Sequence, residues 1–453
     1  MKKIVLLIAL GCIPNLYAQT NPAITSWLQN TTQTGTYYNA GSSATIGNGI
    51  LVNCQAVQYS TDWAYISATG VPAYPTGPFT GDGNPSQATN QNAIFKIPLN
   101  PIPNTGALTA TTGGNIGIFI NGVALFDYRD GVAWNNATSA LCGGPGNPAC
   151  PGGPTAAQPW NRDAIPAEKL GFDCSKGHPA MGNYHHHQNP SAFNLDLTVI
   201  STICDLYAAD GLYAINTGQH SPLIGFAYDG YPIYGAYGYT NSDGTGGISR
   251  IKSGYQLRNI TTRTHWADGT DVADGPAVSA TYFLGYFRED YEFVSHPEED
   301  YLDEHNGRFC VTPEYPNGIY CYFATVDQNH NSAYPYAVGP TFYGVKSASK
   351  VTSITEPVTT YTSTAGLTDN DNTSFLIFPN PSADIVIVQS SGLHTSDIIA
   401  ELVDATGKIM QTQTIFSGST LCYFDVSTLY SGTYFLQIKS GTTNQSYSVV
   451  IAE

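Results

Sequence analysis

Four histidines lie close together in one segment, which reads Gly177-His178-Pro179-Ala180-Met181-Gly182-Asn183-Tyr184-His185-His186-His187. Side chains alternate between the two faces of a β-strand, so His185 and His187 should point to one side and His186 to the other. The Gly182-Asn183 pair favours a turn, which would let His178 fold back onto the face of His185 and His187. Three neutral imidazoles that converge in this way make a usual site for zinc, copper or iron.

Two further histidines are candidates to complete this set of ligands. His220 lies in Gln219-His220-Ser221-Pro222 and is the candidate fourth ligand, while His330 is a more distant one. The sequence therefore predicts a metal site formed by His178, His185, His187 and His220. A structural alternative stays open, because histidines among tyrosines often form hydrogen bonds within a polar core without binding a metal.

Three functions are compatible with the histidine segment. A closed site with four protein ligands would indicate a metal-binding surface protein, whereas three ligands and an open position would indicate a secreted metal-dependent enzyme, either a hydrolase or a redox enzyme. The third is an adhesive or glycan-binding surface module, in which exposed tyrosines bind a flat ligand and the histidines only form hydrogen bonds. Calcium is a further candidate ligand for two oxygen-rich segments, Asp82-Gly83-Asn84 and Asp369-Asn370-Asp371-Asn372.

The segments that carry these residues have the pattern of short β-strands. Residues 46–60 and 62–70 alternate apolar and polar side chains, as half-buried strands do. Ile116–Val123 has the same pattern and contains the turn signal Asn121-Gly122. One short helix is expected at Ala164–Leu170. We therefore predict a large, turn-rich, mainly β domain over residues 20–345.

The chain changes composition after this domain. Ser, Thr, Val and Asp dominate residues 346–374, which is typical of a linker. Residues 375–453 again contain alternating segments, separated by turns at Thr406-Gly407-Lys408 and Ser431-Gly432-Thr433. This unit is predicted to be a small β-sandwich of the Ig-like type. Its expected strands are Ile385–Gln389, Ile399–Asp404, Cys422–Val426, Tyr434–Lys439 and Tyr447–Ile451.

This C-terminal unit resembles the type A sorting domain of type IX secretion, which is found in Bacteroidetes. The matching segments are Phe378-Pro379-Asn380-Pro381-Ser382, Val403-Asp404-Ala405-Thr406-Gly407-Lys408 and Leu429-Tyr430-Ser431-Gly432-Thr433-Tyr434-Phe435-Leu436. The resemblance implies that the type IX secretion machinery is a partner and that the protein is secreted, either released or held at the outer-membrane surface. In the family, the sorting domain is commonly removed.

The large domain resembles the YHYH-domain proteins over about residues 55–344. His178-Pro179-Ala180 and Tyr184-His185-His186-His187 look like the signature of that family. The resemblance implies one fold unit but no particular reaction, because the family name carries no established activity. Further matching segments are Val71-Pro72, Thr76-Gly77-Pro78-Phe79, Asn121-Gly122-Val123, Ser221–Gly235, Asp303–Phe309, Thr312–Tyr320 and Tyr334–Pro340.

The sequence departs from the family pattern at three positions. His186 stands where the family usually has Tyr. His305 stands where Cys is common, and Cys321 stands where His is common. If that last histidine is a ligand in relatives, its role here is lost or has passed to His305.

The N-terminus and the cysteines indicate export. Lys2 and Lys3 followed by the apolar run Ile4–Ile13 predict a signal peptide over residues 1–18. Disulfides are the default in an oxidising destination, although the connectivity cannot be deduced from sequence. Cys142 with Cys150 and Cys310 with Cys321 are attractive pairs, each around a loop, and the remaining cysteines after the leader are Cys54, Cys174, Cys204 and Cys422.

The charge balance excludes one class of partner. Lys and Arg total 17 against 34 for Asp and Glu, which gives a formal net charge of −17. Binding of nucleic acid needs a basic surface, so nucleic acid is not expected as a partner. An acidic surface keeps an exported protein soluble.

Overall fold

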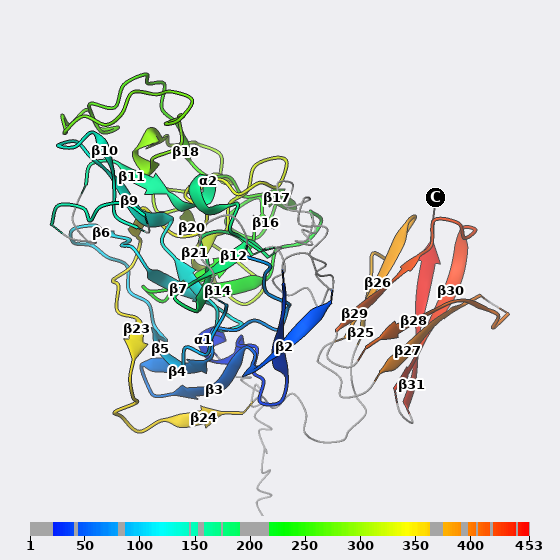
Figure 1. Ribbon diagram of the computed structural model, residues 1–453. Coiled ribbons are helices and arrows are strands. Elements are labelled where there is room, and N and C mark those ends of the chain that lie inside the picture. Colours follow the sequence, from blue (N-terminus) through cyan, green and yellow to red (C-terminus); the bar gives the residue numbers. More distant parts are fainter. Residues whose placement is uncertain are drawn as a thin grey trace, which may run out of the picture.

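The computed structural model in Figure 1 contains two units with separate hydrophobic cores. The expected signal peptide, both candidate calcium segments, Cys174 and Cys204 lie outside the residues that the structure describes. The described residues are 21–39, 44–79, 87–144, 146–152, 158–173, 175–190, 217–362, 375–390, 397–404, 406–416, 420–440 and 443–452.

The chain is mainly β, as its sequence predicts. The described residues contain two short α-helices, α1 (Pro22–Thr25) and α2 (Ala164–Glu168). Helix α2 confirms the helix expected in this region and begins after Asp163, whose side chain accepts a 2.8 Å hydrogen bond from the Ile165 amide. A short 3-10 helix spans Arg288–Asp290.

An eight-stranded sheet forms the centre of the large unit. Its strand order is β12-β13-β8-β7-β14-β15-β21-β20, so two hairpins from distant parts of the chain form its two edges. The middle strands are apolar on both faces and almost fully buried. The strands are β7 (Asn115–Phe119), β8 (Ala124–Phe126), β12 (Gly177–Ala180), β13 (Asn183–His186), β14 (Leu223–Ala227), β15 (Pro232–Tyr234), β20 (Gly307–Cys310) and β21 (Ile319–Phe323).

A five-stranded sheet has the order β23-β5-β4-β3-β24. Its strands β3 and β4 confirm strands within residues 46–60 and 62–70, although the first of these segments also contains β2 (Thr45–Leu51), which belongs to another sheet. Its outer strands come from the predicted linker, so the structure differs from the sequence-based boundary. Residues 349–351 (Ser-Lys-Val) and 359–361 (Thr-Thr-Tyr) are edge strands, where polar and charged side chains are common. The strands are β3 (Cys54–Tyr59), β4 (Trp63–Ala68), β5 (Ala93–Pro98), β23 (Ser349–Val351) and β24 (Thr359–Tyr361).

Smaller sheets surround these two. One is three-stranded with the order β10-β9-β11, and four are two-stranded: β1-β2, β16-β17, β18-β19 and β22-β6. Their strands are β1 (Thr34–Tyr38), β2 (Thr45–Leu51), β6 (Thr109–Ala110), β9 (Arg129–Asn135), β10 (Ala140–Cys142), β11 (Asn161–Asp163), β16 (Tyr237–Tyr239), β17 (Ile248–Arg250), β18 (Tyr255–Leu257), β19 (Tyr291–Phe293) and β22 (Thr341–Phe342).

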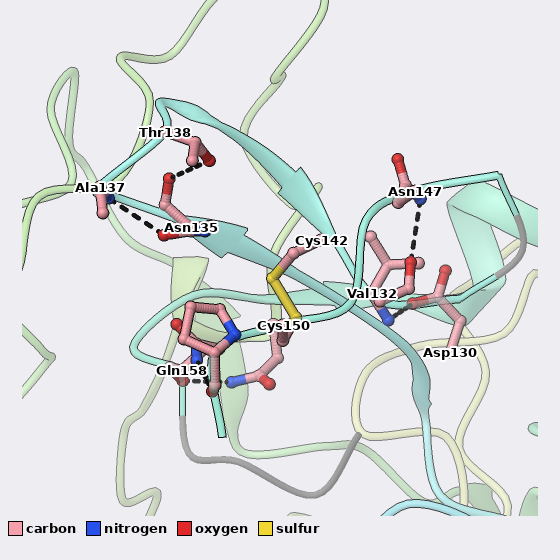
Figure 2. Close-up of a disulfide and its surroundings, with 12 residues drawn as sticks. Asp130, Val132, Asn135, Ala137, Thr138, Cys142, Asn147, Cys150 and Gln158 are labelled. Carbon is pink, nitrogen blue, oxygen red and sulfur yellow. Dashed lines mark hydrogen bonds between the residues drawn. A yellow bond between two sulfur atoms is a disulfide. The ribbon is translucent and has the colours of Figure 1, made fainter. Parts of the chain in front are cut away.

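A disulfide joins Cys142, at the end of β10, to Cys150 in the following loop, as Figure 2 shows. The Cα atoms of the two residues are 4.8 Å apart, and within the loop the Asn147 side chain donates a 3.0 Å hydrogen bond to the Gly143 carbonyl. The sequence predicts this pairing, and the structure confirms it.

The second predicted disulfide, Cys310 with Cys321, does not form, and both residues are buried free thiols. In the β20–β21 hairpin Cys310 lies opposite Ile319, and Cys321 lies opposite Arg308. The two cysteines are therefore diagonal neighbours, and their thiols form a hydrogen bond with each other without a bond between the sulfur atoms. Cys54 and Cys422 are also free and buried.

The C-terminal unit consists of two facing sets of strands with their own apolar core. Each of its five expected strands is present, and β25 and β28 are added. Within the described part of the chain, no helix is long and apolar enough to cross a membrane. The strands are β25 (Phe375–Phe378), β26 (Ile385–Ser390), β27 (Ile398–Val403), β28 (Ile409–Ile415), β29 (Leu421–Asp425), β30 (Gly432–Ser440) and β31 (Thr443–Ile451).

Candidate metal centre

The edge hairpin β12–β13 brings three of the predicted ligands together. His178 and His185 lie directly opposite each other in the antiparallel register. His187 follows two residues after His185 and therefore shares its face. One ring nitrogen from each of these histidines lies within 4.8 Å of the others, and all three residues are buried. We call these three residues the histidine cluster.

The spacing within the histidine cluster is that of metal ligands. The Nε2 atoms of His185 and His187 are 3.1 Å apart. Bonds of about 2.0 Å at tetrahedral angles place two nitrogen ligands of zinc about 3.3 Å apart. The two imidazoles therefore fit a common ion with little movement.

Backbone carbonyls determine which ring nitrogens face inward. The Nδ1 of His187 is 2.6 Å from the Asp127 carbonyl, and the Nδ1 of His185 is 2.9 Å from the Asn183 carbonyl. A carbonyl can only accept, so each Nδ1 carries a hydrogen and each ring turns its Nε2 toward the cluster. This arrangement of a carbonyl behind each ring is the usual one for metal-binding histidines.

Protonation of His185 is unfavourable, so a proton is a poor substitute for a metal ion in the histidine cluster. Burial, followed by the neighbouring imidazoles of His187 and His178, holds the pKa of His185 well below its usual value. The His185 ring therefore stays neutral at physiological pH. A cation between the facing Nε2 atoms of His185 and His187 would stabilise their close approach.

Glu168, the last residue of α2, adds a carboxylate to the histidine cluster. Its Oε2 lies 3.3 Å from Nε2 of His178 and 3.2 Å from Nε2 of His187. Burial raises the pKa of Glu168, but its contacts with His178 and His187 outweigh this, and the net pKa is lowered. Glu168 was not among the predicted ligands. Glu168 lies in the short helix expected just before the histidine segment, but the sequence has no local signal that marks it as a ligand.

Aromatic rings form the walls around the histidine cluster. Phe126 stacks on His185 with ring centroids 3.8 Å apart. Phe172 packs against His178 at 4.9 Å and against His187 at 6.2 Å. These walls fix the ring orientations and exclude water, which strengthens any interaction between a cation and its ligands.

The other histidines of the sequence prediction lie elsewhere. His186 points away from the cluster, as expected, and its Nε2 lies 2.8 Å from the Tyr74 hydroxyl. His220 is not part of the group: its Nδ1 lies 2.8 Å from the Ser221 carbonyl, and its ring packs against Tyr234. His220 lies just before the β14–β15 hairpin and not beside the β12–β13 hairpin that carries the histidine cluster. Its position next to a β-strand in the sequence therefore did not bring it to the cluster. His330 contacts the Tyr237 hydroxyl at 3.0 Å.

Comparison with known proteins agrees with this architecture. No curated protein matches the sequence. The C-terminal unit matches the secretion system C-terminal sorting domain over residues 376–452, so the protein is exported to the cell surface or beyond and interacts with the type IX secretion machinery. The model of the YHYH protein family matches residues 94–334, which is just over half of the chain and includes the histidine cluster with both edge hairpins. The chain therefore belongs to the YHYH protein family.

Proposed function

We propose that the large domain of this exported protein binds one divalent transition metal ion, with zinc as the first candidate. His178, His185 and His187 would supply their Nε2 atoms, and Glu168 would supply a carboxylate oxygen. The observation that carries this proposal is the convergence of three buried imidazoles, two of them with Nε2 atoms 3.1 Å apart and Nδ1 atoms held by backbone carbonyls. Imidazole and carboxylate together are a common ligand set for zinc.

The position of Glu168 favours a closed site over a catalytic one. Its carboxylate oxygen is close to two of the three imidazoles, so three histidines and one carboxylate would complete a tetrahedron. A catalytic site would instead keep one coordination position open for water or substrate. The proposed function is therefore metal binding that holds part of the fold together, and the metal-dependent enzyme is the second candidate, for which Glu168 would have to leave the ion.

Calorimetric titration of the metal-depleted protein with zinc tests the proposal. We expect one equivalent to bind, and we expect single substitutions of His178, His185 or His187 by Ala to weaken binding strongly. His265→Ala is the matched control, because this exposed histidine lies 3.5 Å from Asp271 and outside the cluster. Absence of zinc binding to the folded wild type, or equal binding by the three variants, contradicts the proposal.

A further inference from the structure

The two edge hairpins of the central sheet have the same register. In β12–β13, Gly177 lies opposite His186 and His178 lies opposite His185. In β20–β21, at the other edge, Gly307 lies opposite Tyr322 and Arg308 lies opposite Cys321. Each hairpin then pairs in parallel with an inner strand, β13 with β8 and β21 with β15.

The loops that enter these hairpins are also alike. Asp173 accepts hydrogen bonds from the amides of residues 175 and 177 at 2.9 and 3.1 Å. Asp303 accepts from the amides of residues 305 and 307 at 2.9 and 3.1 Å. In each loop the residue before the glycine has a positive φ, 59° at Lys176 and 66° at Asn306.

The same two carboxylates each bind a tyrosine from the second strand of their hairpin. The Tyr184 hydroxyl donates to Asp173 at 2.9 Å, and the Tyr320 hydroxyl donates to Asp303 at 2.9 Å. Each tyrosine ring meets the ring two residues further along the strand, Tyr184 with His186 and Tyr320 with Tyr322, at 5.3 Å in both cases.

The inner hairpins, β7–β8 and β14–β15, complete the correspondence. Their turns are Asn121-Gly122 and Asp229-Gly230, and both glycines have a positive φ. The amide of Gly122 donates to the Phe119 carbonyl at 2.8 Å, and the amide of Gly230 donates to the Ala227 carbonyl at 2.8 Å. Strands β7 and β14 pair antiparallel at the centre of the sheet, so an approximate two-fold axis passes between them.

We infer that the sheet consists of two copies of one four-stranded unit and that the Arg308 guanidinium in the second copy stands in for the metal ion of the first. The first copy is β7, β8, β12 and β13, and the second copy is β14, β15, β20 and β21. Their registers make Arg308 equivalent to His178, Cys321 equivalent to His185, and Phe323 equivalent to His187. The part of this inference that concerns the metal ion rests on the proposed function.

The contacts of Arg308 support the inference that its guanidinium takes the place of a metal ion. Arg308 is only 8% exposed. Its guanidinium donates to the carbonyls of Tyr239, Thr240 and Glu299, and it lies over the Phe323 ring with 5.5 Å between the guanidinium carbon and the ring centroid. The equivalent rings of His178 and His187 are 5.7 Å apart.

The metal ion of the first copy and the Arg308 guanidinium of the second would each attach an edge hairpin to an equivalent part of the chain. In the first copy, an ion would link the edge hairpin to Glu168, which precedes Asp173 by five residues. In the second copy, Arg308 links the edge hairpin to the backbone of Glu299, which precedes Asp303 by four residues. Each cation thus holds an edge hairpin to the segment that leads into it, and edge strands need such support because one side has no partner strand.

Hydrogen exchange measured by mass spectrometry on the full mature chain tests this inference. We expect Arg308→Ala to increase amide exchange about tenfold or more in residues 307–323 and to leave residues 177–187 unchanged, with Arg308→Lys in between. Removal of zinc from the wild type should increase amide exchange in residues 177–187 and leave residues 307–323 unchanged. Arg258→Ala is the matched control, because Arg258 is also 8% exposed and also donates to backbone carbonyls, those of Glu289 and Trp266.

The part of the inference about Arg308 and the part about the metal ion are contradicted by different results. Unchanged exchange of residues 307–323 in folded Arg308→Ala, or equal loosening of both hairpins, overturns the inference. If Arg308→Ala does not fold, Arg308→Lys carries the same measurement, and unchanged exchange there overturns it equally. If the proposed function is wrong, amide exchange of the wild type will not respond to zinc or to a chelator. That result would not affect the test of Arg308.

A gain of function provides a second test. Arg308→His combined with Cys321→His and Phe323→His recreates the histidine cluster in the second copy. We expect this triple variant to bind two equivalents of zinc where the wild type binds one. A folded triple variant that still binds one equivalent contradicts the equivalence of the two copies.

Discussion

The Nε2 atoms of His185 and His187 lie 3.1 Å apart, while the Nδ1 atom of each ring faces a backbone carbonyl. The carbonyls hold a hydrogen on each Nδ1, so both Nε2 atoms face the cluster. With His178 and the Glu168 carboxylate beside them, the four groups surround a position that suits a cation. The proposed metal site follows from this relationship.

Glu168→Gln should weaken zinc binding without abolishing it. The amide keeps the size of the side chain but loses the negative charge that faces His178 and His187, so we expect the dissociation constant to rise about 10- to 100-fold. Competition with a chromophoric chelator measures the change. Glu304→Gln is the control, because the Glu304 side chain is 53% exposed and outside the cluster. Equal affinities of Glu168→Gln and wild type would remove Glu168 from the ligand set.

Removal of the Cys142–Cys150 disulfide should lower stability without touching the metal site. A cross-link that closes so short a loop is worth about 2 kcal/mol through the entropy of the unfolded chain. We expect the double variant Cys142→Ser/Cys150→Ser to lose about that much free energy of unfolding in a urea titration and to bind zinc with wild-type affinity. A loss of zinc binding would show that the loop supports the site.

His220 should make the domain sensitive to acid. Burial lowers the pKa of His220 from 6.5 to about 4. Between these values the unfolded chain binds a proton that the native chain does not, so stability is lost as the pH falls from 6.5 towards 4. The expected loss is about 2 kcal/mol for this partly exposed group, and His220→Gln should remove it.

Urea unfolding of the chelator-treated protein at pH 7 and at about pH 4.5 measures this effect without interference from metal release. The quantity of interest is the difference between wild type and His220→Gln at the two pH values. If the two proteins lose the same stability on acidification, His220 does not contribute to the acid sensitivity.

The histidine cluster shows what the sequence could predict. The alternation of side chains along a strand correctly separated His186 from His185 and His187, and the Gly182-Asn183 turn correctly returned His178 to their face. Both are local relationships, which depend only on strand geometry. The strands and the short helix were likewise expected from local patterns.

Relationships between distant parts of the chain could not be predicted in this way. Glu168 reaches the cluster because α2 packs beside the edge hairpin, and nothing in the local pattern distinguishes it from other carboxylates. His220 has a favourable position in the sequence but lies against Tyr234. The pairing of Cys310 with Cys321 failed because the two residues are offset in register, which sequence spacing does not define.

The boundary of the large domain is also set by long-range pairing. Residues 349–351 and 359–361 form the edge strands β23 and β24, Ala348 is buried, and Tyr361 packs against the core. A fragment that ends at residue 345 should therefore be about 2 kcal/mol or more less stable than one that ends at residue 362. Urea unfolding of the two fragments measures the difference, and equal midpoints would favour a boundary at residue 345.

The metal content of residues 19–362, purified without a histidine tag after growth with added zinc, tests the central claim most directly. We expect about one equivalent of transition metal in the wild type and none in the His185→Ala/His187→Ala double variant, because three imidazoles are required to hold the ion. Circular dichroism of both proteins establishes that they are folded. If both proteins are folded and both are free of metal, the histidine cluster is a hydrogen-bonded part of the core, and the proposed metal site is contradicted.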